Sequence, residues 1–301
     1  MIDLRIDKAE LEALVAKAIG KAVSLTPLKV RCTYPVFKGD GIFVKVGPMD
    51  EWLQTVELQR QLKDCPFFAR LLVTDPIEYL GYAVFISEWR AAKIVFPEDF
   101  TDAQIESFVS GCVELSKSLS TILENRPNLN SKIGDDYETL VDYAARHRLV
   151  GRLLRPLLSI PESERTFGSH PVTLVHGDFH AKNFAFGGDR FSTVYDFDKL
   201  RFGLACGDLV NALVERFSLL SMSRHNRRRL GEVTKKILAR QPWPMEEIRI
   251  VVNLLRLQFA ARRIRKHPNS IWVVFDILRR DRRILSKHLY KEEKNKMQTL
   301  S

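Results

Sequence analysis

Residues 171–198 contain short apolar stretches that alternate with polar, chemically reactive side chains. A strand is predicted over Pro171-Val-Thr-Leu-Val175, and it runs into the polar segment His176-Gly-Asp-Phe-His-Ala-Lys-Asn183. Two further short strands follow, joined by a Gly-Gly-Asp turn, and the second leads into Asp196-Phe-Asp198. The strands therefore carry the polar residues of this segment to one end of a hairpin.

The rest of the chain predicts an α+β protein with two parts. In the first ninety residues we expect helices at 6–20 and 50–63, with Asp50 able to cap the second, and strands at 22–25, 30–37, 42–46, 71–74 and 82–86. Helical spacing then dominates at 102–123, 137–159, 208–221, 225–240, 245–266 and 270–291. The boundary is expected within residues 88–96, which gives domains at 1–90 and 91–301.

The polar segment has the side chains that phosphoryl transfer requires. This reaction needs a carboxylate that accepts the proton of the acceptor hydroxyl, together with oxygen ligands for the Mg²⁺ that bridges the phosphates. Asp178, Asn183 and Asp196 are of these types, and the spacing from Asp178 to Asn183 is that of the protein-kinase catalytic loop. Together with Asp196-Phe-Asp198, the segment resembles the catalytic signature of aminoglycoside phosphotransferases, choline kinases and their relatives.

The resemblance implies a bilobal, protein-kinase-like fold. The lobe at 1–90 would be a small antiparallel sheet with one helix and would bind the nucleotide, whereas the mainly helical lobe at 91–301 would hold the catalytic residues and the acceptor. It also implies catalytic roles for Asp178 as base and His176 as a brace of the loop, with Asn183 and Asp196 as Mg²⁺ ligands and Asp198 as a further metal contact. Gly207-Asp208 opens an apolar helix, where these families place an aspartate that supports the loop.

Nucleotide-binding residues are expected in the first ninety residues. The resemblance assigns the phosphate-binding lysine to Lys45, paired with a helix glutamate, for which we prefer Glu57 over Glu51 because dipole stabilisation alone explains Glu51. The segment Phe85-Ile-Ser-Glu-Trp89 resembles the hinge that holds the base, which makes Ser87 and Trp89 candidate contacts for ATP or GTP. The segment at 24–29 contains no glycine and includes Pro27, so phosphate binding is expected either to be looser or to use the hydroxyls of Ser24 and Thr26.

The expected acceptor is a small molecule with a hydroxyl group. Only ten positions separate Asp198 from Asp208, and no Ala-Pro-Glu segment follows, which leaves little room for peptide binding as in protein kinases. Residues 201–301 contain 23 Lys and Arg against 9 Asp and Glu, an excess that disfavours a polycationic aminoglycoside. A neutral or anionic, sugar-like acceptor is therefore preferred, in an alcohol-group phosphotransferase whose partners are the nucleotide and this acceptor.

The same basic residues suggest two alternatives. One is a nucleotide-binding pseudokinase whose basic C-terminal helices dock on nucleic acid or on an anionic membrane, and the other is a kinase of a membrane-linked saccharide such as a lipopolysaccharide core. Apolar stretches are too short to span a bilayer, and four scattered cysteines indicate neither a disulfide framework nor a zinc site. We therefore expect a cytoplasmic protein. The alternative is a peripheral position at the inner face of a membrane.

Overall fold

The computed structural model describes residues 6–28, 34–122, 129–219, 221–269 and 271–284 of the 301-residue chain. The chain forms two compact units. The first comprises residues 1–93 and 192–198, and the second comprises residues 94–191 and 199–301. The first boundary lies three residues beyond the predicted one, whereas the return of 192–198 to the first unit was not predicted. In the part of the chain that is described, no helix has the length and apolar character needed to cross a membrane.

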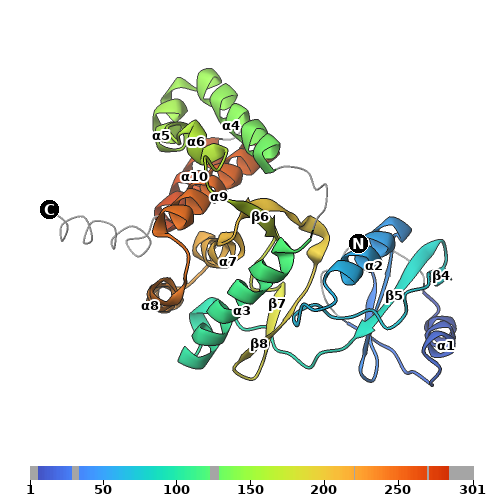
Figure 1. Cartoon of the computed structure of the whole chain (residues 1–301). Helices are drawn as coiled ribbons and strands as arrows, with labels where there is room; N and C mark the ends of the chain where they lie inside the picture. The colour runs from blue at the N-terminus through green and yellow to red at the C-terminus, as the bar shows by residue number, and fades with distance from the viewer. Residues whose placement is uncertain (1–5, 29–33, 123–128, 220, 270, 285–301) are drawn as a thin grey trace. The chain divides into compact units, whose positions relative to one another are not determined.

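The first unit is built on a five-stranded antiparallel sheet (Figure 1). The strand order is β1-β2-β3-β5-β4, with β1 at Thr26–Pro27, β2 at Val36–Lys38, β3 at Ile42–Gly47, β4 at Glu78–Tyr79 and β5 at Tyr82–Glu88. Two helices accompany it, α1 at Lys8–Ile19 and α2 at Met49–Gln61. The Asp7 side chain caps the start of α1, and Gly20, with a φ of 71°, ends it in the left-handed conformation.

The two faces of this sheet have separate cores because side chains alternate along each strand. Ile42, Val44 and Val46 of β3 pack with the buried face of α1, whereas Ala83 and Phe85 of β5 pack with Trp52 of α2. Lys45 is out of phase with the buried β3 residues that pack against α1. Its position on β3 is therefore fixed by the apolar residues on either side of it.

Three expectations for the first unit differ from the structure, and a fourth falls mostly outside the described residues. Residues 22–25 form no strand, and the predicted strand at 71–74 is reduced to one bridge between Leu71 and Ser87, because the Gln59 side chain binds both the N–H and the carbonyl of Leu71. Asp50 does not cap α2, which begins one residue earlier at Met49. Most of the predicted strand at 30–37 falls outside the described residues, and the described part of it contributes Val36 and Phe37 to β2.

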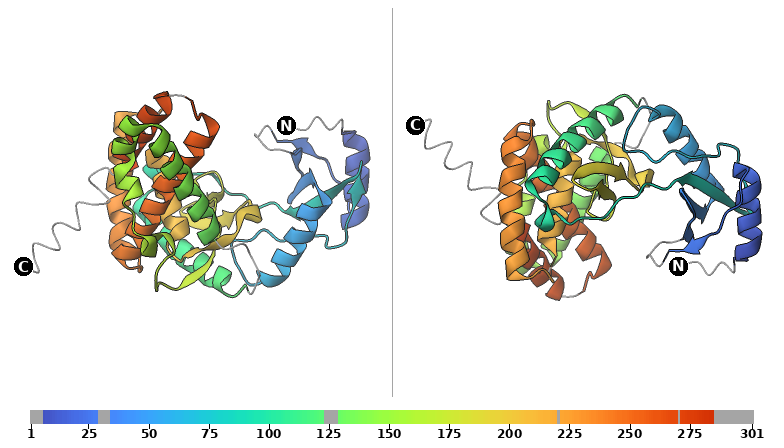
Figure 2. Two further views of the ribbon diagram at one scale, coloured as in Figure 1. Left: turned by 90° about the horizontal axis from the view of Figure 1, so that it is seen from above. Right: turned by 90° about the horizontal axis from the view of Figure 1, so that it is seen from below.

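The second unit is mainly helical, and the long helix α9 (Met245–Lys266) contacts several of the others (Figures 1 and 2). Its apolar residues pack against α4 (Leu129–Arg146) and α10 (Ile271–Ile284), and α7 (Gly207–Ser218) also contacts it. The remaining helices are α3 (Asp102–Ser120), α5 (Arg148–Leu158), α6 (Glu162–Arg165) and α8 (Arg224–Arg240). The single helix expected at 137–159 is in fact two, because the backbone leaves the helical conformation at His147. Residues 285–291 of the expected last helix lie outside the described part.

Four short strands occupy the centre of the sequence, where a return to strand structure was predicted. β6 (Val172–Val175) pairs antiparallel with β9 (Arg201–Leu204), so that Val175 lies opposite Arg201. β7 (Phe184–Gly187) and β8 (Arg190–Val194) form a second two-stranded sheet. The short 3₁₀ turns at Pro97–Asp99 and Phe197–Lys199 complete the described elements. The α+β architecture, with a small antiparallel sheet followed by a larger helical part, is therefore confirmed.

A group of six buried phenylalanines, which we call the phenylalanine cluster, fills the space between α3 and the β7–β8 turn. Rings in contact within it have centroids 5.0 to 6.5 Å apart, in stacked, tilted and edge arrangements. Its members are Phe100, Phe108, Phe179, Phe184, Phe186 and Phe191. Phe179 lies inside the polar segment at 176–183 that resembles a catalytic loop, so the cluster anchors that segment.

Gly111 of α3 provides a test of this packing. A Cβ at position 111 would lie 2.3 Å from a ring carbon of Phe191, so Gly111→Ala is expected to lower the free energy of unfolding by about 1 to 3 kcal/mol through overpacking. The matched control is Gly134→Ala in α4, where a Cβ would meet no atom within 4 Å and alanine is expected to stabilise by about 0.5 to 1 kcal/mol. Urea denaturation measures both. Equal stabilisation by the two substitutions would contradict the packing around Phe191.

Candidate active site

The start of residues 176–183, which we call the candidate catalytic loop, is held by one buried carboxylate. Asp208, on the first turn of α7, accepts hydrogen bonds from the backbone N–H of His176 at 2.9 Å and from that of Gly177 at 3.3 Å. Burial raises the pKa of Asp208, and the charge of His176 and the two backbone N–H groups act against this. The structure thus places the aspartate expected to support the loop in contact with the backbone of the loop.

His176 and Gly177 define the path of the loop as it leaves β6. The His176 ring is fully buried, packs edge-on against Phe179 at 5.6 Å, and has Nδ1 3.4 Å from the N–H of Asp178. Gly177 has a φ of 80°, and a Cβ there would lie 2.1 Å from the carbonyl oxygen of Lys199. Glycine is required at this position by both the backbone conformation and the close approach of the neighbouring chain.

The Asp178 carboxylate is half-buried at the turn of the loop and lies between two basic side chains. Lys199 forms an ion pair with Oδ2 of Asp178, and Nε2 of His180 is 4.0 Å from the same oxygen. Burial favours a higher pKa for Asp178, but the hydrogen bond and charge of Lys199 outweigh it, and the pKa lies below its usual value. Asp178 is therefore ionised at neutral pH, which is the form that accepts a proton.

Asn183 closes the loop. Its side-chain amide Nδ2 donates to the carbonyl of Asp178 at 3.0 Å, and its backbone N–H donates to the carbonyl of His180 at 2.8 Å. This hydrogen bond fixes the orientation of the carboxamide, whose oxygen is the atom that can bind a cation. A carboxamide oxygen is a suitable ligand for Mg²⁺, which is commonly held by one or two protein oxygens together with substrate phosphates.

Asp196 belongs to the first unit, with the rest of residues 192–198. The chain before it is fixed by the N–H of Val194, which donates to the carbonyl of Phe67 at 3.0 Å, and the Phe197 ring packs against Phe68. Asp196 is exposed and has a φ of 64°, a conformation that is uncommon for a residue other than glycine. The donor chemistry of Asp196 and Asn183 fits Mg²⁺. The side chain of Asp198 lies outside the described part of the structure.

The partner of Lys45 is Glu51, and the preference for Glu57 was wrong. Nζ of Lys45 is 2.6 Å from Oε2 of Glu51 on the first turn of α2. Glu57 instead binds Arg60 at 2.5 Å and Gln61 at 2.9 Å on its own helix. The reason is that α2 begins directly after β3, so its first turn lies beside the end of the strand, whereas Glu57 lies nearly two turns further along the helix.

The other residues predicted to contact the nucleotide are Ser24, Thr26, Ser87 and Trp89. Glu12 of α1 accepts from the N–H of Leu25, which lowers the pKa of that carboxyl. Ser24, the residue before Leu25, is exposed, and its role as a phosphate contact stays a prediction. Thr26 lies in β1, before a connection whose residues 29–33 are outside the described part. Ser87 pairs with Phe43 on β3. The backbone N–H of Trp89 donates to the carbonyl of Gly41. Its ring stacks on Phe43 and has Nζ of Lys38 4.7 Å from its centre, and its role as a base contact stays a prediction.

Two cations beside the loop, Lys199 and Arg201, were missed at the level of sequence. Lys199 directly follows Asp196-Phe-Asp198, and Arg201 opens β9, which pairs with the strand that precedes the loop. The signal that could have revealed them is the short apolar stretch at 202–204, which has the length and polarity of a partner strand for β6. Antiparallel pairing would then have brought residues 199–201 next to 175–177.

Many of the basic residues counted in the last third of the chain are paired. Arg256 binds Asp281, Arg265 binds Asp136 and Arg263 binds Asp276, and the carboxylate of Asp136 is buried. Further pairs join Arg216 to Glu98 and Lys236 to Asp102. Part of the positive charge is therefore neutralised within the fold, and the total charge is weaker evidence about the acceptor than the two cations at the loop.

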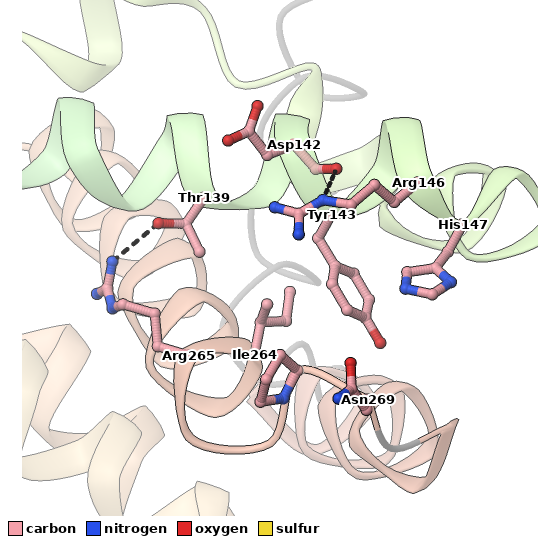
Figure 3. A pocket seen from close by; sticks show the side chains of 9 residues that line it. Thr139, Asp142, Tyr143, Arg146, His147, Ile264, Arg265 and Asn269 are labelled. Atoms are coloured by element: carbon pink, nitrogen blue, oxygen red, sulfur yellow. Dashed lines mark hydrogen bonds between the residues drawn. The ribbon is translucent and has the colours of Figure 1, made fainter.

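A hollow of about 390 Å³ opens between α4 and α9 (Figure 3). Figure 3 shows that the guanidinium of Arg265 reaches the hydroxyl of Thr139, and that of Arg146 reaches the carbonyl of Asp142. The complete lining is Thr139, Asp142, Tyr143, Arg146, His147, Ile264, Arg265, Pro268 and Asn269. None of these belongs to the candidate catalytic loop, and the two arginines are engaged with neighbours, so the loop is the stronger candidate site.

Removal of the Asp208 carboxylate is expected to loosen the loop. In Asp208→Ala, the buried N–H groups of His176 and Gly177 lose their acceptor, and the free energy of unfolding should fall by about 2 to 5 kcal/mol. Asp208→Asn retains one acceptor oxygen and should lower the free energy of unfolding by about half as much as Asp208→Ala. Urea denaturation with Glu232→Ala as control measures the effect, since Glu232 forms only an exposed pair with Arg228. Loss of stability no greater than in the control would refute this role of Asp208.

Comparison with known proteins identifies the family of the chain. The model of the phosphotransferase enzyme family matches residues 55–234, more than half of the chain. Comparison with curated proteins finds no match. Among solved structures, this chain is similar to the GDP complex of aminoglycoside 2'-phosphotransferase-IIIa, with 14% identity, a TM-score of 0.65, and coverage of 92% of this chain and 98% of that chain.

Two further structures show the same fold. Amicoumacin kinase hAmiN in complex with AMP-PNP, Ca²⁺ and Ami is 13% identical, with a TM-score of 0.59 and coverage of 95% of each chain. A choline/ethanolamine kinase family protein from Mesorhizobium loti is 17% identical, with a TM-score of 0.59 and coverage of 93% of this chain and 97% of that chain. With its candidate catalytic loop, its two-part α+β architecture and the match of the family model, the chain belongs to the phosphotransferase enzyme family and has a protein-kinase-like fold.

Proposed function

We propose that this protein transfers the γ-phosphate of ATP or GTP to a hydroxyl group of a small neutral or anionic, sugar-like molecule, with Asp178 as base. The observation that carries the proposal is the ionised Asp178 carboxylate, held on a loop whose two ends are fixed by Asp208 and Asn183. Such fixation limits how far a base can move from the hydroxyl that it must deprotonate. The nucleotides named with similar structures, AMP-PNP and GDP, support a nucleotide donor.

In this proposal the acceptor hydroxyl hydrogen-bonds to Asp178, which takes up its proton as the oxygen attacks the γ-phosphorus. The bond between that phosphorus and the oxygen bridging the β- and γ-phosphates breaks, so the products are a nucleoside diphosphate and a phosphate monoester. Asn183 and Asp196 are proposed to hold Mg²⁺, which neutralises phosphate charge when bound. His176 contributes by bracing the loop rather than by touching the substrate, which agrees with its complete burial.

Lys45 and Glu51 form the proposed phosphate-binding pair of the first unit. Lys45 is about one-third exposed and lies near the rings of Phe85 and Tyr34, so the carboxylate of Glu51 is the group that holds its ammonium in place. In the family pattern, a lysine in this position binds the α- and β-phosphates. Trp89 is proposed as a base contact through a group other than its backbone N–H, which already donates to Gly41.

The preference for a neutral or anionic acceptor rests on the cations at the loop. Lys199 and Arg201 follow the candidate catalytic loop in the second unit, and a polycationic acceptor near Asp178 would have to overcome their repulsion. By contrast, the paired arginines on α9 and α10 provide little support for this preference. The expected contact of the basic C-terminal helices with a membrane or polyanion stays a prediction.

The assignment of the base is tested by substitution of Asp178. A screen for transfer of radiolabelled γ-phosphate to sugars, amino alcohols, nucleosides and aminoglycosides should find an acceptor among the neutral or anionic sugar-like compounds. With that acceptor, Asp178→Ala should reduce kcat by about 10² to 10⁴-fold, the usual contribution of a general base. The control is Asp189→Ala at the exposed β7–β8 turn, expected to change kcat less than about twofold. Full activity of Asp178→Ala would rule out this base.

The identity of the lysine partner leads to a separate prediction. Glu51→Gln removes the charge that orients Lys45 and should lower kcat/KM for the nucleotide about tenfold or more. Glu57→Gln changes the same side chain on the same helix but should leave kcat/KM within about twofold, because Glu57 contacts Arg60 and Gln61. Steady-state kinetics at varied nucleotide concentration distinguishes them. A larger effect of Glu57→Gln than of Glu51→Gln would contradict the assignment.

A further inference from the structure

Arg201 has an unusual position beside the candidate catalytic loop. It begins β9 directly opposite Val175, the last residue of β6 before the loop. Its aliphatic stem crosses Gly177, since a Cβ at Gly177 would be 3.1 Å from Cγ of Arg201 and 3.2 Å from its Cδ. The backbone pairing and the missing side chain at Gly177 therefore fix the stem of Arg201 one residue away from Asp178.

The guanidinium of Arg201 has no bonding partner among the described residues. Its Nε is buried without a hydrogen bond, and its side chain takes part in no ion pair or ring contact. Four other described arginines also have a buried, unbonded Nε, but each is engaged elsewhere. Arg249 and Arg263 bind carboxylates, Arg227 binds a carbonyl oxygen, and Arg165 lies over the ring of Tyr137. Arg201 differs from all four.

The nearby carboxylates do not satisfy Arg201. Burial lowers its pKa, whereas the charges of Asp208 and Asp178 act in the opposite direction from a distance. The Asp208 oxygens accept from the backbone of His176 and Gly177, and the Asp178 carboxylate is paired with Lys199. A guanidinium whose Nε is buried without a hydrogen bond is costly, so this arrangement favours binding of an external anion.

The space next to Arg201 has the size and polarity of a subsite for part of a ligand. A cavity of about 30 Å³ is lined by Gly177, Arg201 and Asp208, together with Asn211 of α7 and Gln258 of α9 and apolar residues of the second unit. This volume holds one or two water molecules, or the oxygens of a small anionic group. Asn211 and Gln258 provide amide donors in the same wall.

We infer that Arg201 binds an anionic group of the phosphate acceptor, a carboxylate or a phosphate, and so selects acidic acceptors. The inference rests on the proposed function and names the acceptor class more narrowly. Every residue lining the cavity belongs to the second unit, whereas the proposed phosphate-binding pair, Lys45 and Glu51, belongs to the first. The planar guanidinium presents paired donors that match both carboxylate and phosphate.

A matched series of three-carbon compounds tests the inference by direct binding. Glycerol has no anionic group, glycerate has a carboxylate and glycerol 3-phosphate has a phosphate. Their dissociation constants are measured by calorimetry with the full chain in saturating AMP-PNP, which keeps the phosphate probe out of the nucleotide site. The wild type should bind one or both anions more tightly than glycerol, and comparison of the two identifies the preferred anion.

Substitutions at position 201 then separate charge from geometry. Arg201→Gln should weaken binding of the preferred anion by about 10- to 100-fold without changing glycerol binding. Arg201→Lys keeps the charge but loses the paired donors of the guanidinium, so its affinity for the anion should lie between those of the wild type and Arg201→Gln. The control is Arg228→Gln, because Arg228 is exposed on α8 and paired only with Glu232. Thermal melting of each variant verifies folding, and the lysine variant tests the site if the glutamine variant does not fold.

The same compounds used as acceptors distinguish failure of this inference from failure of the proposed function. Loss of anion binding in Arg201→Gln supports the role of Arg201 even if no compound receives the γ-phosphate from the wild type. Equal binding of all three compounds to the wild type, or equal binding of the anions by wild type and Arg201→Gln, overturns the role of Arg201, whether or not phosphate transfer is observed.

Discussion

The hydrogen bonds from the His176 and Gly177 backbone to Asp208 are the constraint on which the active-site arrangement depends. They join the strand before the candidate catalytic loop to the first turn of α7, although 31 and 32 positions separate the partners in sequence. Because both N–H groups are directed at one buried carboxylate, the loop leaves β6 in a single direction. Gly177 then turns in the left-handed conformation, and Asp178 reaches the position at which Lys199 pairs with it.

Sequence patterns predicted the elements of this site better than its contacts. The chain order of strand, loop, hairpin and helix follows from apolar spacing and glycine-containing turns, and the structure contains all of them. The Glu51 pair could not be obtained in this way, because the choice depends on which turn of α2 lies beside β3. The hydrogen bond from the Leu25 N–H to Glu12 likewise depends on packing of α1 on the sheet, which the local sequence does not encode.

The distribution of charge likewise depends on contacts that sequence patterns do not predict. A count of residues 201–301 suggests a strongly basic surface, but it treats every side chain as independent. Pairing depends on acidic residues that are distant in the chain, as in Arg265 with Asp136 and Arg216 with Glu98. What the count could not reveal is that two cations of this region, Lys199 and Arg201, differ from the rest by lying beside the candidate catalytic loop.

The return of residues 192–198 to the first unit affects how this protein can be made. The segment that pairs with Phe67 and Phe68 is synthesised about a hundred residues after the rest of the first unit. During translation the first unit therefore stays incomplete until much of the helical part has been synthesised. A recombinant fragment that ends at Lys93 would lack this segment, so dissection of the two units requires a circular permutant or a linked peptide rather than a simple truncation.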